Sequence, residues 1–358
     1  MISTRIFFIL SAFLYIPAAA YKCPEGVDVI NPPSDLETPT FYPDTWSEGQ
    51  PIPSLDSNQH CFTTVNVPSG FYANVIFYRD FTTDSGSYVT YPNNRITRIV
   101  NNDSYPFYFT SPQFNINFQN PKNITDSSYK FAFKIRWGKF PPVPERLINI
   151  DRGNPPVAIV PNSDLTVFIA NPNSQISLMA FSLVNSSQTP LLRQSAIYGG
   201  DSFDSEFIGT LDQVLASKYP LTAYQNRLSV YTFDLKNHFN YPLFMGQDTQ
   251  DTREYVFYTG ANCADHVNCV VLLDGLFGNS LTVTDSEHIE HVKGFNTFSS
   301  TAVINVYESH VANTSFIASL TPDNYFRQLP LKVGGIMKFY ELKGYGSCEM
   351  IIQRSSFF

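Results

Sequence analysis

Residues 130–137 have the sequence KFAFKIRW, in which large apolar side chains alternate with smaller or basic ones. Phe131, Phe133 and Ile135 fall on one face of an extended chain, and the basic side chains fall on or near the other face. A period of two residues is typical of a β-strand that has one face in a core and the other in water. This stretch therefore predicts a half-buried strand.

Similar strand signals lie on the N-terminal side of this segment. Residues 71–78 (FYANVIFY) are aromatic and β-branched with partial alternation, and they follow a turn sequence at 68–70 (PSG). Further short strands are predicted at 63–67, 87–91, 96–100, 105–110 and 113–118. About seven short strands at this spacing are typical of a β-sandwich.

The remaining chain divides at proline-rich segments. Residues 31–53 are dense in proline and predict an irregular lead-in, and 140–144 (FPPVP) predicts a boundary between domains. Strand-rich regions follow, and apolar spacing predicts one helix at 205–218. A faint repeat relates the region after residue 269 to the region after residue 61. The predicted fold class is all-β, as tandem sandwiches with one or two short accessory helices.

The N-terminus predicts export from the cell. Arg5 precedes an apolar run at 6–16, and Pro17 and three alanines follow it, which is the pattern of a cleaved signal peptide over residues 1–20. No later segment approaches the roughly 18 apolar residues of a membrane helix. We expect a secreted, extracellular product.

The composition excludes some classes of partner. Charged residues make up 15% of the chain and the net charge is −8, so there is no basic field for nucleic acid or acidic lipid. Polar surface must come largely from Ser, Thr, Asn and Gln, which suits a glycoprotein or a protein that contacts sugars.

Five cysteines in an oxidising compartment predict disulfides. Cys23 and Cys61 are isolated from the others and are natural partners. Among the remaining three, the pairing Cys263–Cys269 is favoured with Cys348 free or paired between chains, and Cys269–Cys348 is nearly as plausible. The spacing excludes none of these choices.

Four Asn-x-Ser/Thr sequons predict N-glycosylation and therefore solvent-exposed loops. The predicted acceptors are Asn102, Asn123, Asn185 and Asn313.

Several short motifs within residues 23–137 occur together in one known family. They are Cys23-Pro24, NPP at 31–33, YPDTW at 42–46, Cys61, VPSGFYA at 67–73, PFYF at 106–109 and Trp137. With them the segment resembles the nematode CUB-like domain family. The resemblance implies CUB-like sandwich domains at 21–140 and, in divergent form, at 253–358. The strand-rich region between them predicts a β-rich middle domain at 150–252. It also implies a secreted protein of the innate immune or stress response, and it supplies no enzymatic activity.

The sequence offers only weak candidates for catalytic or metal-binding residues. His288-Ile289-Glu290-His291 is the densest group of metal-binding residue types, but its order is not His-Glu-x-x-His, and a solvated loop or short exposed helix is expected there. Ser347 lacks the sequence context of a nucleophile elbow. Asp80, Asp84 and Asp103 do not match the acidic set of a CUB calcium site. We therefore predict no catalytic residue, cofactor or metal site.

Loop aromatic residues offer another kind of site. Tyrosine and tryptophan rings can stack on sugars, although core packing is the simpler interpretation. The candidates are Tyr42, Trp46, Tyr88, Tyr91 and Tyr105. The predicted function is an extracellular binding or effector module for an unknown protein or glycan, such as one carried on a microbial or epithelial surface. The alternative is a structural matrix or lumenal component without catalytic activity.

Overall fold

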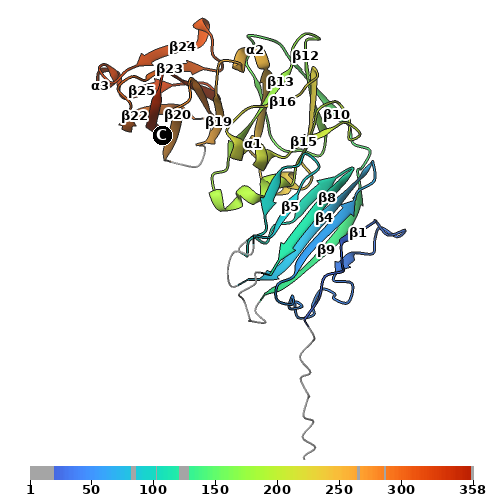
Figure 1. The fold of residues 1–358 in the computed structure, drawn as a ribbon. Coiled ribbons are helices and arrows are strands. Elements are labelled where there is room, and N and C mark those ends of the chain that lie inside the picture. The colour runs from blue at the N-terminus through green and yellow to red at the C-terminus, as the bar shows by residue number, and fades with distance from the viewer. Residues whose placement is uncertain are drawn as a thin grey trace, which may run out of the picture.

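The computed structural model describes residues 20–81, 86–101, 103–120, 129–263, 267–285 and 288–355. The predicted signal peptide lies outside these ranges except for its last residue. Figure 1 shows β-rich lobes that follow one another along the chain, from blue and cyan at the N-terminal end to orange and red at the C-terminal end.

The first lobe is a sandwich of two sheets. Sheet A has the strand order β1 (Val27–Ile30), β3 (His60–Asn66), β8 (Gln113–Gln119), β5 (Tyr88–Thr90) and β6 (Ile96–Arg98). Sheet B has the order β2 (Thr40–Tyr42), β9 (Lys130–Lys139), β4 (Phe71–Asp80) and β7 (Phe107–Thr110). The proline-rich lead-in contributes only β2, and this strand lies at the edge of its sheet, where a lost N–H donor is tolerated.

Alternating burial in β3 and β4 shows which face of each sheet is turned to the core between the two layers. Val75 and Phe77 of β4 and Phe131 of β9 point into one aromatic core, and Phe131 stacks on Phe118 of sheet A with 4.2 Å between ring centroids. The strands predicted at 130–137 and 71–78 are both present. The expectation that 130–137 keeps its second face in water is wrong, because Ala132 and Lys134 on that face are also buried and Lys134 pairs there with Glu48. Aromatic rings bury large areas and account for much of the packing energy of such a core.

The rest of the chain builds three more sheets. Sheet C has the order β10 (Glu145–Ile150), β12 (Leu165–Ala170), β17 (Arg227–Tyr231), β14 (Ala196–Tyr198) and β15 (Phe207–Gly209). Sheet D has the order β11 (Val157–Ile159), β18 (Phe244–Asp248), β13 (Ile176–Ser182), β19 (Phe257–Asn262), β21 (Ser280–Asp285), β26 (Met337–Lys343), β23 (Val303–Glu308) and β24 (Phe316–Leu320), and β16 (Leu221–Thr222) also pairs with β13. Sheet E has the order β20 (Asn268–Gly275), β27 (Gly346–Arg354), β22 (Glu290–Phe298) and β25 (Leu331–Val333).

Sheets C and D connect the lobes. Val167 of β12 lies in the core of the first sandwich, while its neighbour Phe168 lies in the next core against sheet D. Strand β13 pairs in parallel with β19 through Phe181 and Gly260, so sheet D continues across residue 252. The all-β tandem architecture is confirmed, while the exact domain boundaries remain a prediction.

The helices in the described part of the chain are short. The α-helices are α1 (Leu211–Ser217), α2 (Thr249–Thr252) and α3 (Tyr325–Gln328), and the 3-10 helices are η1 (Ser186–Arg193), η2 (Leu235–Asn237) and η3 (Asn313–Ser315). The helix predicted at 205–218 begins later than expected, because residues 207–209 form strand β15. Helix α1 ends where Lys218 adopts a left-handed backbone with φ of 57°.

Two disulfides are present among the described residues. They join Cys23 to Cys61 and Cys263 to Cys269, and Cys348 is a buried free thiol. The alternative pairing of Cys269 with Cys348 does not form.

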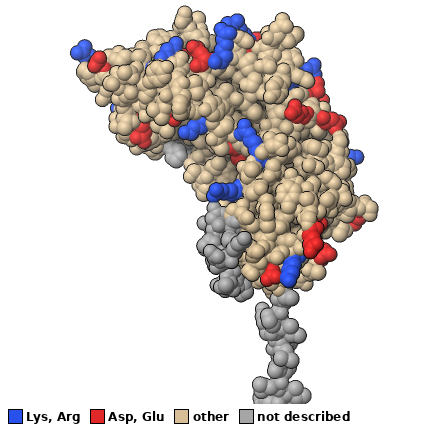
Figure 2. All heavy atoms as spheres, viewed as in Figure 1, with Lys and Arg blue, Asp and Glu red and all other residues tan. Residues whose placement is uncertain are grey.

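The surface reflects the low charge of the sequence. Charged side chains are sparse and of mixed sign on the face shown in Figure 2. None of the described helices is both long and apolar enough to cross a membrane.

Candidate functional site

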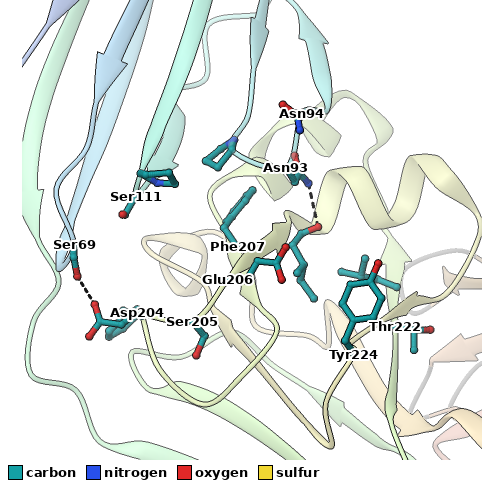
Figure 3. A pocket seen from close by; sticks show the side chains of 15 residues that line it. Ser69, Asn93, Asn94, Ser111, Asp204, Ser205, Glu206, Phe207, Thr222 and Tyr224 are labelled. Atoms are coloured by element: carbon teal, nitrogen blue, oxygen red, sulfur yellow. Dashed lines mark hydrogen bonds between the residues drawn. The ribbon is translucent and has the colours of Figure 1, made fainter.

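A groove lies where the first sandwich meets sheet C. It has a volume of about 510 Å³, within the range of small-molecule sites. We call it the first hollow (Figure 3). Its lining residues come from separate loops and short strands: Ser69, Pro92, Asn93, Asn94, Ser111, Pro112, Phe203, Asp204, Ser205, Glu206, Phe207, Ile208, Leu221, Thr222 and Tyr224.

One wall is the loop between β5 and β6. Asn94 has a φ of 61°, a left-handed conformation that asparagine tolerates better than most residues. This turn places the neighbouring Asn93 against the middle lobe, by which we mean sheet C with helices η1 and α1. Asn93 Nδ2 donates there to the Ile208 carbonyl and to Gln213 Oε1, both at 3.0 Å. Arg95 Nη1 donates to the Gln213 carbonyl at 3.3 Å. These contacts hold the wall against α1 and β15.

The opposite wall is the β14–β15 connection. The Gly199 N–H donates to the Glu206 carbonyl at 2.9 Å, and the Ser205 N–H donates to the Ser202 carbonyl at 3.1 Å. The Asp204 carboxylate accepts a hydrogen bond from the Ser69 hydroxyl of the first sandwich. Both lobes therefore contribute to the shape of the groove.

Aromatic packing fixes the base of this wall. Phe207 is buried and lies parallel to Tyr91 of the first sandwich, with 6.3 Å between centroids. Phe203 stacks on Phe140 with 4.1 Å between centroids. The loop that carries Asp204 and Glu206 is thus anchored at both ends, so binding need not first order it.

The exposed chemistry of the first hollow is polar and partly acidic. Asp204 and Glu206 are exposed, and none of the described residues that line the hollow is lysine or arginine. Figure 3 shows Ser69 and Asp204 at one end, and Asn93 and Tyr224 toward the other. Tyr224 is 85% exposed. The arrangement can bind a ligand through hydroxyl, amide and carboxylate groups next to an aromatic face.

The structure places most predicted sugar-stacking aromatics in the interior. Tyr42, Trp46 and Tyr91 are buried, so the core interpretation holds for these three. Tyr88 and Tyr105 are half-buried. None of the five lines the groove, and Tyr91 lies behind it, against the lining residue Phe207.

The expectation that residues 288–291 form a solvated loop or short exposed helix is wrong for the second half of the segment, because Glu290 begins strand β22. The strand sends Glu290 into the core and leaves His291 half-buried on the opposite face. Glu290 accepts hydrogen bonds from Thr284 at 2.9 Å and Tyr340 at 3.0 Å. Neighbouring residues on a strand face opposite ways, so these two side chains cannot share one ion.

Glu290 gives a pH prediction. Burial is the largest influence on this carboxyl and raises its pKa, outweighing the charge of Lys338 at 3.8 Å. A carboxyl whose pKa is higher in the folded state than in the unfolded state stabilises the folded protein while it is protonated. This contribution is complete below the unfolded pKa, about 4.3, and is lost as the pH rises through the folded pKa. We expect the free energy of unfolding of the natural chain, minus that of Glu290→Gln, to fall as the pH rises above the unfolded pKa of about 4.3.

Urea denaturation of both proteins across this range measures that difference. Burial lowers the pKa of the Lys338 ammonium and the Glu290 carboxylate opposes that shift, so Glu290→Gln lowers the pKa of Lys338 further. Earlier loss of this buried positive charge stabilises the variant as the pH rises, so it changes the difference in the same direction. A difference that rises with pH would mean that the ion pair outweighs desolvation.

The other residues considered for calcium binding or catalysis do not form a site among the described residues. Asp80 pairs with Lys130 at 3.4 Å, Asp103 pairs with Arg193, and Asp84 lies outside the described residues. Ser347 and Cys348 lie within strand β27 rather than at a strand-to-helix turn. The described residues contain no group of three or more His, Cys, Asp or Glu side chains arranged to hold a metal.

The sequon asparagines fall into two groups. Asn185 and Asn313 are exposed, whereas Asn102 and Asn123 lie outside the described residues. Exposure makes Asn185 and Asn313 accessible to a glycan, and glycosylation of all four stays a prediction.

Sequence reasoning missed the groove. Its acidic and amide residues come from loops more than 100 positions apart, and the pattern around each is that of an ordinary turn. One local signal was available: Tyr224 stands in the polar run 222–226 (TAYQN), where a core aromatic is not expected.

Comparison with known proteins finds one protein family that matches part of the chain. No curated protein matches the chain. Two solved structures with similarity are the CUB1-EGF-CUB2 domains of rat MASP-1 (9% identity, TM-score 0.24, 62% of this chain and 100% of that one) and of human MASP-1/3 (7% identity, TM-score 0.22, 86% and 97%). Likeness at these TM-scores carries no weight for the fold or the function. The family match is to the CUB-like domain and spans residues 18–141, so the part of the chain that forms the first sandwich is similar to CUB-like domains.

Proposed function

We propose that this chain is a secreted extracellular binding module whose ligand occupies the first hollow. The observation that carries the proposal is the groove itself, in which exposed Glu206 and Tyr224 lie beside the anchored Asn93. CUB-like domains often mediate extracellular binding, and the groove uses loops of the CUB-like segment for one of its walls.

The biological setting is part of the same proposal. The N-terminal export pattern, the four sequons and the CUB-like resemblance support a glycoprotein that acts outside the cell in innate immunity or the stress response. Its role there is to bind a surface or a partner rather than to catalyse a reaction.

The alternative is a structural matrix component that is cross-linked through Cys348. The structure weighs against this cross-link, because Cys348 has no exposed surface and burial raises the pKa of its thiol. A disulfide between chains would need strand β27 to open.

The test is binding of the secreted chain to glycan arrays, intact bacteria and epithelial cells. We expect saturable binding to at least one of these, and Glu206→Ala is expected to weaken it by about tenfold or more, because a hydrogen bond to a charged group contributes about 1.5–3 kcal/mol. Glu145→Ala is the matched control, since Glu145 is an exposed glutamate outside the groove.

Two outcomes would count against the proposal. If the folded chain binds none of the three targets, the binding function fails. If binding occurs and both alanine variants bind as the natural chain does, the groove is not the site.

A further inference from the structure

A second hollow adjoins the first one at Tyr224. It has a volume of about 470 Å³. Its lining residues are Pro172, Asn173, Ser174, Gln175, Tyr224, Gln225, Asn226, Thr249 and Gln250. Tyr224 lines both hollows, so the two adjoin at this exposed aromatic residue, and we call them together the depression.

The loop that carries Tyr224 is held on both sides. The Gln175 amide donates to the Tyr224 carbonyl at 3.2 Å, and the Asn226 amide donates to the Ala170 carbonyl at 3.0 Å. Before the tyrosine, the Ala223 N–H donates to the Ile176 carbonyl at 3.3 Å. The backbone is therefore fixed while the ring projects into solvent, which is the arrangement of a preorganised contact rather than of a core residue.

The polar groups in the second hollow are all uncharged. Asparagine, glutamine, serine and threonine side chains both donate and accept hydrogen bonds, as sugar hydroxyls do. The first hollow adds the carboxylates of Asp204 and Glu206, which accept hydrogen bonds from hydroxyls. None of the described residues that line the two hollows is lysine or arginine. A sulfated, sialylated or phosphorylated ligand would therefore find no positive charge there to balance its own negative charge.

We propose that this depression binds an uncharged oligosaccharide that crosses Tyr224, with sugar units in both hollows and one unit stacked on the tyrosine ring. This inference rests on the proposed binding function and names its ligand class. An aromatic face is apolar and suits the C–H face of a pyranose ring, while the amides on either side take up its hydroxyls. A peptide is the less favoured occupant, because the exposed side chains of the depression are mostly amides and hydroxyls rather than an apolar anchor pocket.

The test uses a length series of neutral oligosaccharides, from single sugars to hexasaccharides, on an array that also carries anionic glycans of the same lengths. We expect affinity to rise with length until both hollows are filled, and neutral chains to bind in preference to anionic ones. Positive array signals are then titrated by calorimetry with the purified, secreted chain.

Three variants separate the ring from other effects. Tyr224→Ala is expected to remove most of the gain with length, about tenfold in affinity, while Tyr224→Phe keeps the ring and the gain. Tyr345→Ala is the matched control, because Tyr345 is also strongly exposed (71%) and lies outside both hollows. Both sites are exposed, and the melting temperature of each variant checks that it folds.

The outcomes distinguish this inference from the proposed function. Neutral glycan binding that is independent of length, or unchanged in Tyr224→Ala, overturns the inference and leaves the binding function standing. Binding only to anionic glycans, or only to proteins on bacteria or epithelial cells, does the same. If the folded chain binds no glycan, bacterium or epithelial cell, the proposed function fails together with the inference.

Discussion

Replacing Arg193 by methionine is expected to lower the free energy of unfolding by about 3–5 kcal/mol. Arg193 is 2% exposed at the end of η1, and its guanidinium donates to both oxygens of Asp103, which is 8% exposed. It also donates to the Pro106 carbonyl at 3.1 Å and lies 3.5 Å from the centroid of the Phe107 ring. One side chain thus joins the middle lobe to the first sandwich, and its removal leaves a buried carboxylate without its partner.

The matched control is Arg227→Met. Arg227 pairs with Asp201, but both side chains are about half exposed, so the loss is expected to stay within about 1 kcal/mol. Urea denaturation of both variants measures the difference. A double-mutant cycle with Asp103→Asn should show that the two losses are far from additive. If Arg193→Met costs no more than Arg227→Met, the buried pair does not stabilise the junction between the lobes.

Removing the disulfide between Cys23 and Cys61 is the second large change. The two cysteines are separated by 38 positions, and closing a loop of that length in the unfolded chain is worth about 4 kcal/mol on the chain-entropy model. Cys61 is buried in the first core, so the bond ties the proline-rich lead-in to sheet A. We expect the double serine variant to lose roughly that amount of stability in urea denaturation without reductant.

The second disulfide provides the comparison. Cys263 and Cys269 are only 6 positions apart, so the same model gives a loss of about 2 kcal/mol when both become serine. The ratio of the two losses tests the loop-length argument more sharply than either value alone. Equal losses would show that local packing around the sulfur atoms, rather than loop closure, determines the effect.

The junction explains why the groove is where it is. Its walls come from the CUB-like segment and from sheet C, which lies beyond that segment. The buried Arg193–Asp103 pair and the Asn93 contacts fix the two parts relative to each other. A ligand in the first hollow would therefore contact both lobes at once, and the isolated CUB-like segment would supply only one wall.

The strands of the first sandwich follow from local pattern alone. Residues 130–137 form β9 as predicted, because an inward residue of a strand is apolar whatever its partner strand is. The pairing of Cys23 with Cys61 was also accessible, since those two cysteines stand apart from the rest. In each case the information lies within one segment or in the count of a rare residue type. The burial of Lys134 on the other face of β9 could not be predicted, because its partner Glu48 lies 86 positions away.

The exceptions depend on contacts between distant segments. Phe207 and Ile208 fit the apolar spacing of the helix that follows them, yet they form β15, because Phe207 packs against Tyr91 from the first sandwich. Glu290 reads as part of a solvated motif, but it lies in a core beside Tyr340. Tertiary packing overrides local propensity at such positions.

The sequence alone was enough to predict an all-β chain and most strands of its first sandwich, namely β3 to β9. The candidate site could not be predicted in this way, because Asn93, Glu206 and Tyr224 belong to three turns that come together when sheet C packs on the first sandwich. The two differ in the distance along the chain over which the residues interact. Burial of one face of a strand and the residue preferences of turns involve near neighbours in the chain, so they produce a pattern in the local sequence. Which turns meet in space depends on the packing of whole sheets, and no single segment records it.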